Sequence, residues 1–252
     1  MSLVSGRGNG HVTPCELCPL RKRESLREFT AEELAYVKDF KVDELRVDPG
    51  ASFLREGTRS EHLYTVLSGW AFRYKMLDDG RRQILNYALP ADMVGLQGAL
   101  MREMEHSVEA LTPLTLCVFP RAKMWDLYSR VPSLAFDITW LAAREEQLID
   151  QHLLSVGRRS ALERTAYLLL HLFVRAQEAG MVKDNTIQFP FTQQHLADTL
   201  GMSLVHTNKT LKRIFQSKAI RWEHRNFQMI DRAALTELAG DTVKKRLPRP
   251  FV

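Results

Sequence analysis

The sequence predicts an α+β protein with an N-terminal antiparallel β-roll, a long helix and a C-terminal winged helix-turn-helix. Residues 42–119 contain short apolar or alternating runs, separated by turns rich in glycine, proline and aspartate. Pro132 opens a stretch with apolar residues at helical spacing, and residues 192–214 form two short helical patterns that meet at Gly201. We therefore divide the chain into residues 1–28 (a tail), 29–131 (the roll), 132–157 (the long helix) and 158–252 (the C-terminal domain).

The composition is that of a globular protein. The chain has 252 residues, of which 45% are hydrophobic and 26% are charged. Its longest apolar runs are shorter than the roughly 18 residues that a membrane span requires. Residues 1–14 are rich in Gly and Ser and carry no apolar leader segment. We therefore expect a cytoplasmic protein that does not contact membranes.

Positive charge is concentrated in the C-terminal part of the chain. Residues 157–252 contain 16 Lys and Arg against 8 Asp and Glu, whereas residues 1–156 contain 19 against 22. A basic part beside a slightly acidic one predicts that the C-terminal end binds a polyanion, although a solvated basic surface would give the same count.

Local signals mark the elements before the long helix. Thr30 and Glu33 form a capping-box pattern, so a short helix should begin at Ala31, with Phe29 packed on Leu34. The turns that follow predict about eight short antiparallel strands in a closed or rolled sheet. The clearest runs are residues 52–54, 63–67, 71–76, 83–89, 107–111 and 114–119.

Apolar residues of the long helix recur at spacings of 4, 3 and 7, with two polar residues in the same phase. Such a seam predicts pairing with a second copy of the helix in a homodimer. The alternative is that the helix packs on its own sheet. Gly157 is expected to end the helix and mark a domain boundary. The predicted dimer residues are Leu134, Ile138, Leu141, Glu145, Leu148 and His152.

The most specific pattern lies at residues 192–214. Thr192 and Ser203 can cap two helices, and Gly201 supplies the turn between them. In the second helix Thr207, Leu211 and Ile214 share one face and should be buried, which leaves the opposite face free to enter the major groove of DNA. The predicted DNA-binding residues are Thr192, Gln193, Gln194, Ser203, Leu204, Val205, His206, Asn208, Lys209 and Lys212.

These residues should divide into base readers and phosphate contacts. Lys209 is the first candidate to contact a base, with Asn208 as the alternative, whereas Gln193, Gln194 and His206 suit phosphate oxygens near helix N-termini. Residues 220–223 and 227–230 should form a β-hairpin wing. Six cations against two acidic residues lie between Thr192 and Arg225, which favours DNA over a helical hairpin without a nucleic-acid role.

The order of roll, long helix and winged helix-turn-helix resembles the cyclic-AMP receptor protein/FNR superfamily of bacterial transcription regulators, over roughly residues 15–240. The segments 69–72, 79–80 and 91–95 are similar to the glycine pattern of that family's roll, and residues 83–95 resemble the FNR branch. The resemblance implies a cyclic-nucleotide-binding-like jelly roll and a homodimeric regulator that is not an enzyme. It also implies as partners a palindromic operator in double-stranded DNA and RNA polymerase.

The sequence departs from the family at residues that contact the ligand and the DNA. Cyclic-nucleotide binders have an Arg-Ser pair where this chain has His106-Ser107, so a phosphate would lose its bidentate partner and we do not expect cyclic AMP to bind. Val205 and Lys209 stand where the family often has Glu and Arg. The preferred DNA half-site should therefore differ from those of the best-known members.

Cys15, Cys18 and Cys117 resemble part of the four-cysteine iron–sulfur set of the FNR branch, whose further cysteine is replaced by Glu24. We therefore expect no cofactor, and folding and DNA binding in air without iron. An iron–sulfur cluster on these three cysteines, or a thiol redox sensor, stays open as the alternative. Another alternative is a small-molecule-binding regulatory subunit acting on a partner protein. The eight histidines lie at no metal-ligand spacing, and no P-loop or nucleophile elbow is present.

Overall fold

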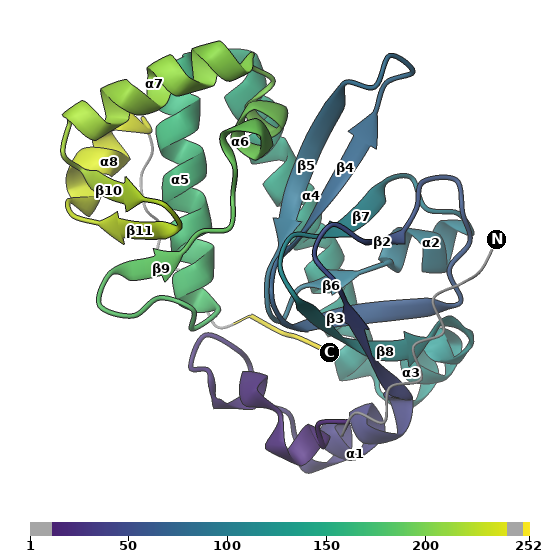
Figure 1. The fold of residues 1–252 in the computed structure, drawn as a ribbon. Coiled ribbons are helices and arrows are strands. Elements are labelled where there is room, and N and C mark those ends of the chain that lie inside the picture. Colours follow the sequence, from purple (N-terminus) through teal and green to yellow (C-terminus); the bar gives the residue numbers. More distant parts are fainter. Residues whose placement is uncertain (1–11, 241–248) are drawn as a thin grey trace.

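The computed structural model describes residues 12–240 and 249–252, so residues 1–11 of the expected tail lie outside the described part (Figure 1). The N-terminal part is a roll flanked by helices. Its elements are 3-10 helices at Cys15–Leu17 and Pro19–Lys22, α1 (Ala31–Phe40), β1 (Asp43–Val47), β2 (Ser52–Leu54), β3 (His62–Ser68), β4 (Ala71–Met76), β5 (Arg82–Ala88), β6 (Met93–Val94), α2 (Leu96–Met101), β7 (Ser107–Ala110), β8 (Leu114–Pro120), a 3-10 helix at Arg121–Lys123 and α3 (Met124–Arg130).

The long helix and the C-terminal domain follow. They comprise α4 (Pro132–Arg158), α5 (Ala161–Glu178), β9 (Thr186–Gln188), α6 (Gln193–Leu200), α7 (Leu204–Gln216), β10 (Ile220–Glu223), β11 (Asn226–Met229) and α8 (Arg232–Leu238). The predicted fold class is therefore confirmed.

The roll consists of two four-stranded antiparallel sheets, ordered β1-β8-β3-β6 and β2-β7-β4-β5. This agrees with the expected eight strands, although β1 and β6 lie outside the six clearest runs. Gly69, between β3 and β4, has φ +94°, and a Cβ there would lie 2.3 Å from the Pro113 carbonyl oxygen. Only glycine fits such a backbone and such an approach.

Helix α1 begins at Ala31, as its capping box predicts. The Glu33 amide donates to the Thr30 hydroxyl (3.2 Å), and the Thr30 amide donates to the Glu33 carboxylate (2.8 Å). Phe29, which was expected to pack on Leu34, stacks instead on Phe251 from the far end of the chain.

Helix α4 does not end at Gly157. It continues to Arg158, and the chain turns where Arg159 is extended and Ser160 caps α5 through a capping box with Glu163. A glycine in the last helical turn costs only about 1 kcal/mol relative to alanine, too little to stop a helix that packing supports. The cap of the following helix therefore sets the boundary.

The wing contains one strand more than the sequence predicts. Strands β10 and β11 pair with Glu223 opposite Asn226, so the turn is His224-Arg225 and the second strand begins one residue earlier than expected. His224 occupies the left-handed region (φ +56°) that a two-residue hairpin turn requires. Strand β9 adds to the edge of β11, giving the order β10-β11-β9.

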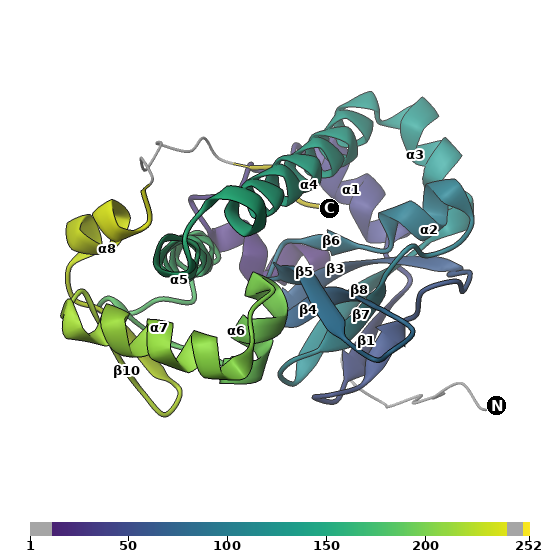
Figure 2. The same cartoon turned by 90° about the horizontal axis from the view of Figure 1, so that it is seen from above.

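One hydrophobic core spans the roll and the C-terminal domain. Trp70 on the roll meets Phe191 edge to face at 5.2 Å, and Tyr87 of β5 meets the same ring at 4.7 Å. Viewed from above, α6 lies beside β4 and β5 while α4 passes along another side of the roll (Figure 2). Apolar burial therefore holds the helix-turn-helix against the roll.

Candidate nucleic-acid interface

The helix-turn-helix is formed by α6 and α7, each with the predicted cap. The Thr192 hydroxyl accepts a hydrogen bond from the His195 amide (3.1 Å), and the Ser203 hydroxyl accepts one from the His206 amide (3.2 Å). Gly201 ends α6 in the left-handed conformation (φ +61°). The predicted inward residues of both helices are buried: Leu196, Ala197, Leu200, Thr207, Leu211 and Ile214.

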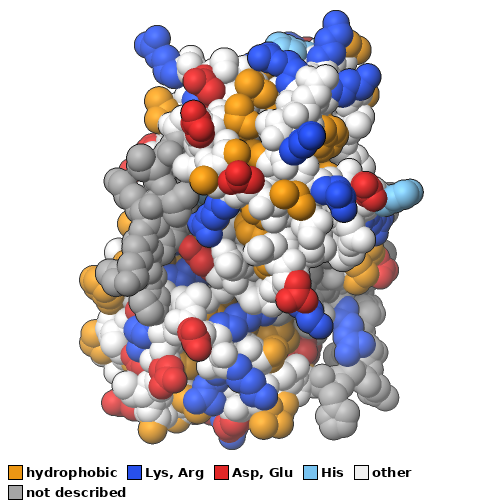
Figure 3. Space-filling model, turned by 90° about the vertical axis from the view of Figure 1, so that its left-hand side faces the viewer, with side chains coloured by type: hydrophobic (Ala, Val, Ile, Leu, Met, Phe, Trp, Pro, Cys, Tyr) orange, Lys and Arg blue, Asp and Glu red, His pale blue; other side chains and the backbone are white. Residues whose placement is uncertain are grey.

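The opposite face of α7 is open to solvent. Val205 is 65% exposed and Leu204 42%, and the polar residues of this face are also exposed. Blue Lys and Arg side chains lie along the upper edge of the face in Figure 3, at the level where α7 lies in Figure 1. The exposed polar residues of α7 include His206, Lys209, Lys212 and Arg213. Arg213 is an addition to the residues that the sequence predicts.

Asn208 differs from the expectation of an outward-facing residue. Its side chain is half-buried, and its Oδ1 atom is sealed from solvent without a hydrogen-bond partner. The residue directly follows the buried Thr207 and lies three positions before the buried Leu211, so it sits at the border of the two faces. As the helix is placed, Asn208 is a poor candidate to read a base.

Residues at the start of α6 are exposed, but one is already engaged. Gln193 and Gln194 both face solvent, and the Gln194 amide donates to the Asp198 carboxylate (2.6 Å). Asp198 in turn accepts from the Arg82 guanidinium of β5 (2.9 Å). Sequence analysis missed this tie between the helix-turn-helix and the roll, because the two residues lie 116 positions apart.

Further contacts fix α6 on the roll. The Gln83 amide donates to the Thr199 carbonyl oxygen (2.9 Å), and the Tyr87 hydroxyl lies 2.7 Å from the Thr199 hydroxyl. The helix-turn-helix is therefore positioned by polar contacts as well as by the shared core.

The wing adds cations beside α7. Lys218, Arg221 and Arg225 are all exposed, and Lys218 occupies the left-handed region (φ +59°) at the turn before β10. A recognition helix flanked by an exposed basic hairpin is an arrangement that can contact both base edges and phosphates.

The N-terminal half of the predicted dimer seam of α4 is buried within its own chain. Leu134 is 0% exposed, Ile138 1% and Leu141 5%, because they pack into the core of the same chain. Glu145 pairs with Arg73 of β4, and His152 Nε2 lies 3.3 Å from the Gln83 amide nitrogen. The burial of Leu134, Ile138 and Leu141 favours the alternative that the helix packs on its own sheet, because periodicity identifies an apolar stripe but not the surface that it covers. The dimer interface itself stays a prediction. Leu148, the remaining predicted dimer residue, is half-buried and lines a small cavity together with residues of β5 and α5.

A second apolar stripe of α4 faces solvent. Phe136 is 69% exposed, Ile149 42% and Leu153 70%, with the exposed Ala142 and Ala143 between them. Several large apolar side chains in the open along one helix are unusual for a monomer and typical of an association surface. Sequence analysis missed this stripe because α4 carries apolar residues on two faces.

A cavity of about 350 Å³ lies between the roll and α4, lined by residues of β6, α2 and α4 together with Arg73, Asp92, Gly95, His106 and Arg249. His106 is 5% exposed, and its Nε2 atom has no hydrogen-bond partner. Burial and the nearby Arg73 and Lys75 lower the pKa of His106 to about 4. His106 is therefore neutral at pH 7 and cannot replace the arginine that pairs with a cyclic-nucleotide phosphate.

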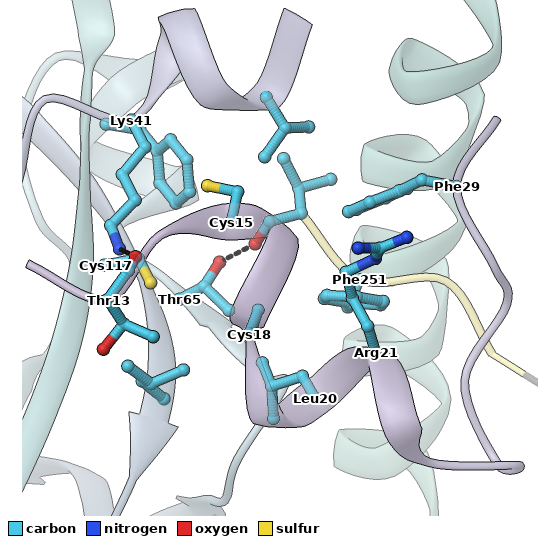
Figure 4. A pocket seen from close by; sticks show the side chains of 14 residues that line it. Thr13, Cys15, Cys18, Leu20, Arg21, Phe29, Lys41, Thr65, Cys117 and Phe251 are labelled. Atoms are coloured by element: carbon cyan, nitrogen blue, oxygen red, sulfur yellow. Dashed lines mark hydrogen bonds between the residues drawn. The ribbon is translucent and has the colours of Figure 1, made fainter. Parts of the chain in front are cut away.

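Cys15, Cys18 and Cys117 line one small cavity of about 30 Å³, the size of a single water molecule (Figure 4). Glu24, at the position of the family's further cysteine, is exposed and does not line it. Within residues 12–240 and 249–252, no three His, Cys, Asp or Glu side chains are placed to hold a metal ion. As arranged, the residues do not fit an iron–sulfur cluster, which needs four ligands and more room.

Two thiols of this cavity, Cys15 and Cys117, are protonated at neutral pH because burial raises their pKa. Burial raises the pKa of the Cys15 thiol and raises that of Cys117 to about 12. Since the thiolate is the reactive form, neither group is activated for redox chemistry in this arrangement.

No helix in the described part of the chain is long and apolar enough to cross a membrane.

Comparison with known proteins supplies two family matches. Residues 44–131 match the cyclic nucleotide-binding domain, and residues 163–238 match the Crp-like helix-turn-helix domain. The first covers most of the roll and the second runs from α5 to α8.

The chain is also similar to whole regulators. It is 31% identical over 241 residues to the nitrogen fixation regulation protein FixK of Bradyrhizobium diazoefficiens, covering 95% of this chain and 98% of FixK. It is 27% identical to the transcriptional activator protein FnrL of Cereibacter sphaeroides, covering 93% and 95% of the two chains. The solved structure of FixK2 from Bradyrhizobium japonicum superposes with a TM-score of 0.71 at 24% identity over 80% of this chain and 98% of FixK2, a likeness of fold.

Proposed function

The chain belongs to the Crp/FNR superfamily, as a DNA-binding transcription regulator of its FNR-like branch, and we propose that it acts as a cytoplasmic homodimer on a palindromic operator. The family consists of regulators and not of enzymes, and the matched helix-turn-helix has no use in a subunit that only regulates a partner protein. The observation that carries the proposal is the solvent-exposed face of α7, with Lys209, Lys212 and Arg213 on it. The major groove admits a helix of this kind.

Within this proposal, Lys209 reads a base and the residues near the helix N-termini hold the backbone. Lys209 is exposed in the second turn of α7, on the side of the exposed Val205, and an ammonium group there suits guanine O6 or N7. Gln193, Gln194 and His206 are exposed at the beginnings of α6 and α7, where amide groups and the helix dipole favour phosphate. Thr192 and Ser203 contribute to the interface indirectly, because they cap the first turns of α6 and α7.

In vitro selection from random double-stranded DNA tests the proposal. The wild-type protein should enrich an inverted repeat. Lys209→Ala should cost about 1 to 3 kcal/mol on that site and relax preference at one base pair per half-site. Failure of the wild-type protein to enrich any sequence would overturn the proposed function.

Lys218→Ala is the matched control, because it removes the same charge beside the wing and not from α7. It should weaken cognate and random DNA alike and lower the salt slope by about one unit per half-site. If Lys209→Ala instead recovers the wild-type consensus with uniformly lower affinity, Lys209 is a phosphate contact.

The exposed stripe of α4 is the surface that we propose for the homodimer. Phe136, Ile149 and Leu153 present the apolar area that the buried seam cannot. A dimer places two recognition helices on two half-sites, which raises affinity because the second binding event becomes intramolecular. As in the family, we propose RNA polymerase as the partner at promoters.

The cavity between the roll and α4 is the proposed effector site. Its lining combines apolar residues of β6, α2 and α4 with charged residues and the neutral His106. Leu100 and Met101, which are exposed, and Ile149 of the α4 stripe also line it. Cyclic AMP should not bind, because the neutral His106 replaces the family's arginine, and Arg73 and Arg249 in the same lining are already paired with Glu145 and Asp92. Isothermal titration calorimetry with cyclic AMP should show no heat of binding. Saturable binding would contradict the prediction that this cavity does not accept cyclic AMP.

We also propose that DNA binding does not require iron. The thiol cavity is too small for a cluster, and Glu24, at the position of the family's further cysteine, is exposed and does not line it. Protein purified without oxygen should lack a broad visible absorption band and should bind the selected site equally in air. A band that bleaches in air together with loss of DNA binding would establish the cluster instead.

A further inference from the structure

The segment Arg249–Val252 lies against the roll, although it follows the C-terminal domain in the chain. Figure 1 shows it running beneath the strands of the roll. Phe251 is 4% exposed and Val252 3%, and both belong to the same core cluster as Phe119 of β8. A segment this short buries both apolar side chains only where a fitting groove exists.

The backbone of the segment pairs with residues 25–27. The Arg249 amide donates to the Ser25 carbonyl oxygen (2.9 Å), and the Arg27 amide donates to the Arg249 carbonyl oxygen (2.8 Å). Leu26 and Arg249 thus form a parallel β-bridge. Such pairing is how extended peptides add to the edge of another segment.

The Arg249 side chain enters a buried acidic site. Its guanidinium lies 3.0 Å from the Asp92 carboxylate and donates to the carbonyl oxygens of Pro90 (3.2 Å) and Ala91 (3.3 Å). Asp92 also pairs with Arg175 of α5 at 2.6 Å. If Arg249 leaves, Asp92 therefore keeps a buried partner, so release does not strand an unpaired charge.

The apolar end of the segment fills the groove beside the thiols. The Phe251 ring stacks on Phe29, with centroids 4.6 Å apart, and the Thr65 hydroxyl donates to the Val252 carbonyl oxygen (Figure 4). Phe251 and Val252 line the same cavity as Cys15, Cys18 and Cys117. The segment therefore closes the space around Cys117.

We propose that the groove between residues 13–29 and the roll is a recognition site for the Arg-Pro-Phe-Val segment, held as an internal peptide ligand that ties the C-terminal domain to the roll. The site selects a cation followed two residues later by an aromatic side chain. Backbone pairing sets the register, Asp92 takes the cation, and Phe29 takes the ring. Peptide binding at this groove can be measured without DNA, so its outcome is independent of the proposed function.

Thiol alkylation of the folded protein is the first test. A variant ending at Pro248 and the full chain are treated with iodoacetamide, and labelling of each cysteine is followed by peptide mass spectrometry. Cys117 should react about tenfold faster or more in the shortened chain, because water then reaches the thiol and its pKa falls. Equal rates would overturn the proposal.

Two point variants guard against a shortened chain that does not fold. Phe251→Ala and Arg249→Ala should each accelerate Cys117 labelling, in the same direction as the truncation. Phe215→Ala is the matched control, because it removes an exposed phenylalanine from α7, away from the cysteines, and should leave the rate unchanged. Acceleration by the control to the same extent would point to general loosening and contradict the proposal.

Binding of the peptide in trans is the decisive test. A fluorescent Gly-Gly-Arg-Pro-Phe-Val peptide should bind the shortened chain saturably, restore slow labelling of Cys117, and fail to bind the full chain, whose groove is filled. Peptides with Glu for the arginine or Ala for the phenylalanine should not bind. No binding, or equal binding of the Glu peptide, would overturn the proposal.

Discussion

At the scale of single residues, His106 is a buried imidazole without a partner for Nε2, next to Arg73 in the cavity under α4. Its pKa is lowered to about 4 in the folded protein, against about 6.5 in an unfolded chain. Well above pH 6.5 both states are neutral, so the residue adds no pH dependence there. Between pH 6.5 and 4 the unfolded state binds the extra proton, and stability is lost as the pH falls.

This shift predicts a pH dependence that a single variant removes. Between pH 7 and pH 5, His106 should lower the free energy of unfolding by about 2 kcal/mol. His106→Gln should abolish that part of the loss, since glutamine does not titrate. Urea unfolding at both pH values measures it, with His224→Gln, on the exposed wing turn, as the control that should behave like wild type. Parallel curves for His106→Gln and wild type would contradict the buried neutral imidazole.

The sequence patterns correctly predicted those features that depend on residues close together in the chain. The caps at Thr30, Thr192 and Ser203 all form as expected, because each joins groups three positions apart. Asn208 could not be placed this way, since it lies at the edge of a helical face. Arg175, within the apolar stretch of α5, was a signal that could have been used: a cation there requires a buried acidic partner, which is Asp92.

At the scale of elements, α4 shows what periodicity does not determine. The helix has one apolar stripe around Leu141 and another around Leu153, and the sequence alone does not say which of them the roll covers. The roll is held on α4 through contacts far apart in the chain, such as Glu145 with Arg73. Only the three-dimensional structure therefore separates the core stripe from the free one.

The two stripes of α4 give opposite expectations for the same substitution. Leu153→Lys places a charge on the exposed stripe, so it should leave the fold intact but give monomers and weaken DNA binding. Leu141→Lys buries the charge in the core of the same chain and should unfold the protein. Size-exclusion chromatography with light scattering and circular dichroism distinguish the two. A stable dimer for Leu153→Lys would show that this stripe is not the interface.

At the scale of the whole molecule, the roll and the C-terminal domain are joined by shared burial and a charged centre. Asp92, 5% exposed, pairs with Arg175 from one domain and with Arg249 from the far end of the chain. These arginines, together with a hydrogen bond from the Leu89 amide, hold the pKa of Asp92 below its usual range despite its burial. None of these long-range pairs could be predicted from the sequence, because no local pattern links residues more than 80 positions apart.

Thermal unfolding should reflect this connection between the roll and the C-terminal domain. With its shared core, the wild-type chain should unfold in a single calorimetric transition, in which the roll and the C-terminal domain melt together. Arg175→Met leaves Asp92 still paired with Arg249, so it strands no charge and should lower the free energy of unfolding by about 1.5 to 3 kcal/mol, the range for a lost hydrogen bond to a charged group. Asp92→Asn should cost more, because it strands two buried guanidinium groups.

The double variant tests whether Asp92 and Arg175 stabilise the protein through their mutual interaction. With both Asp92→Asn and Arg175→Met in place, the loss should fall short of the sum of the single losses by about 0.5 to 3 kcal/mol, the range found for residues in direct contact. Strictly additive losses would mean that each residue stabilises its own domain separately. In that case the single transition of the wild-type chain would have to come from the apolar contacts of Trp70, Tyr87 and Phe191 alone.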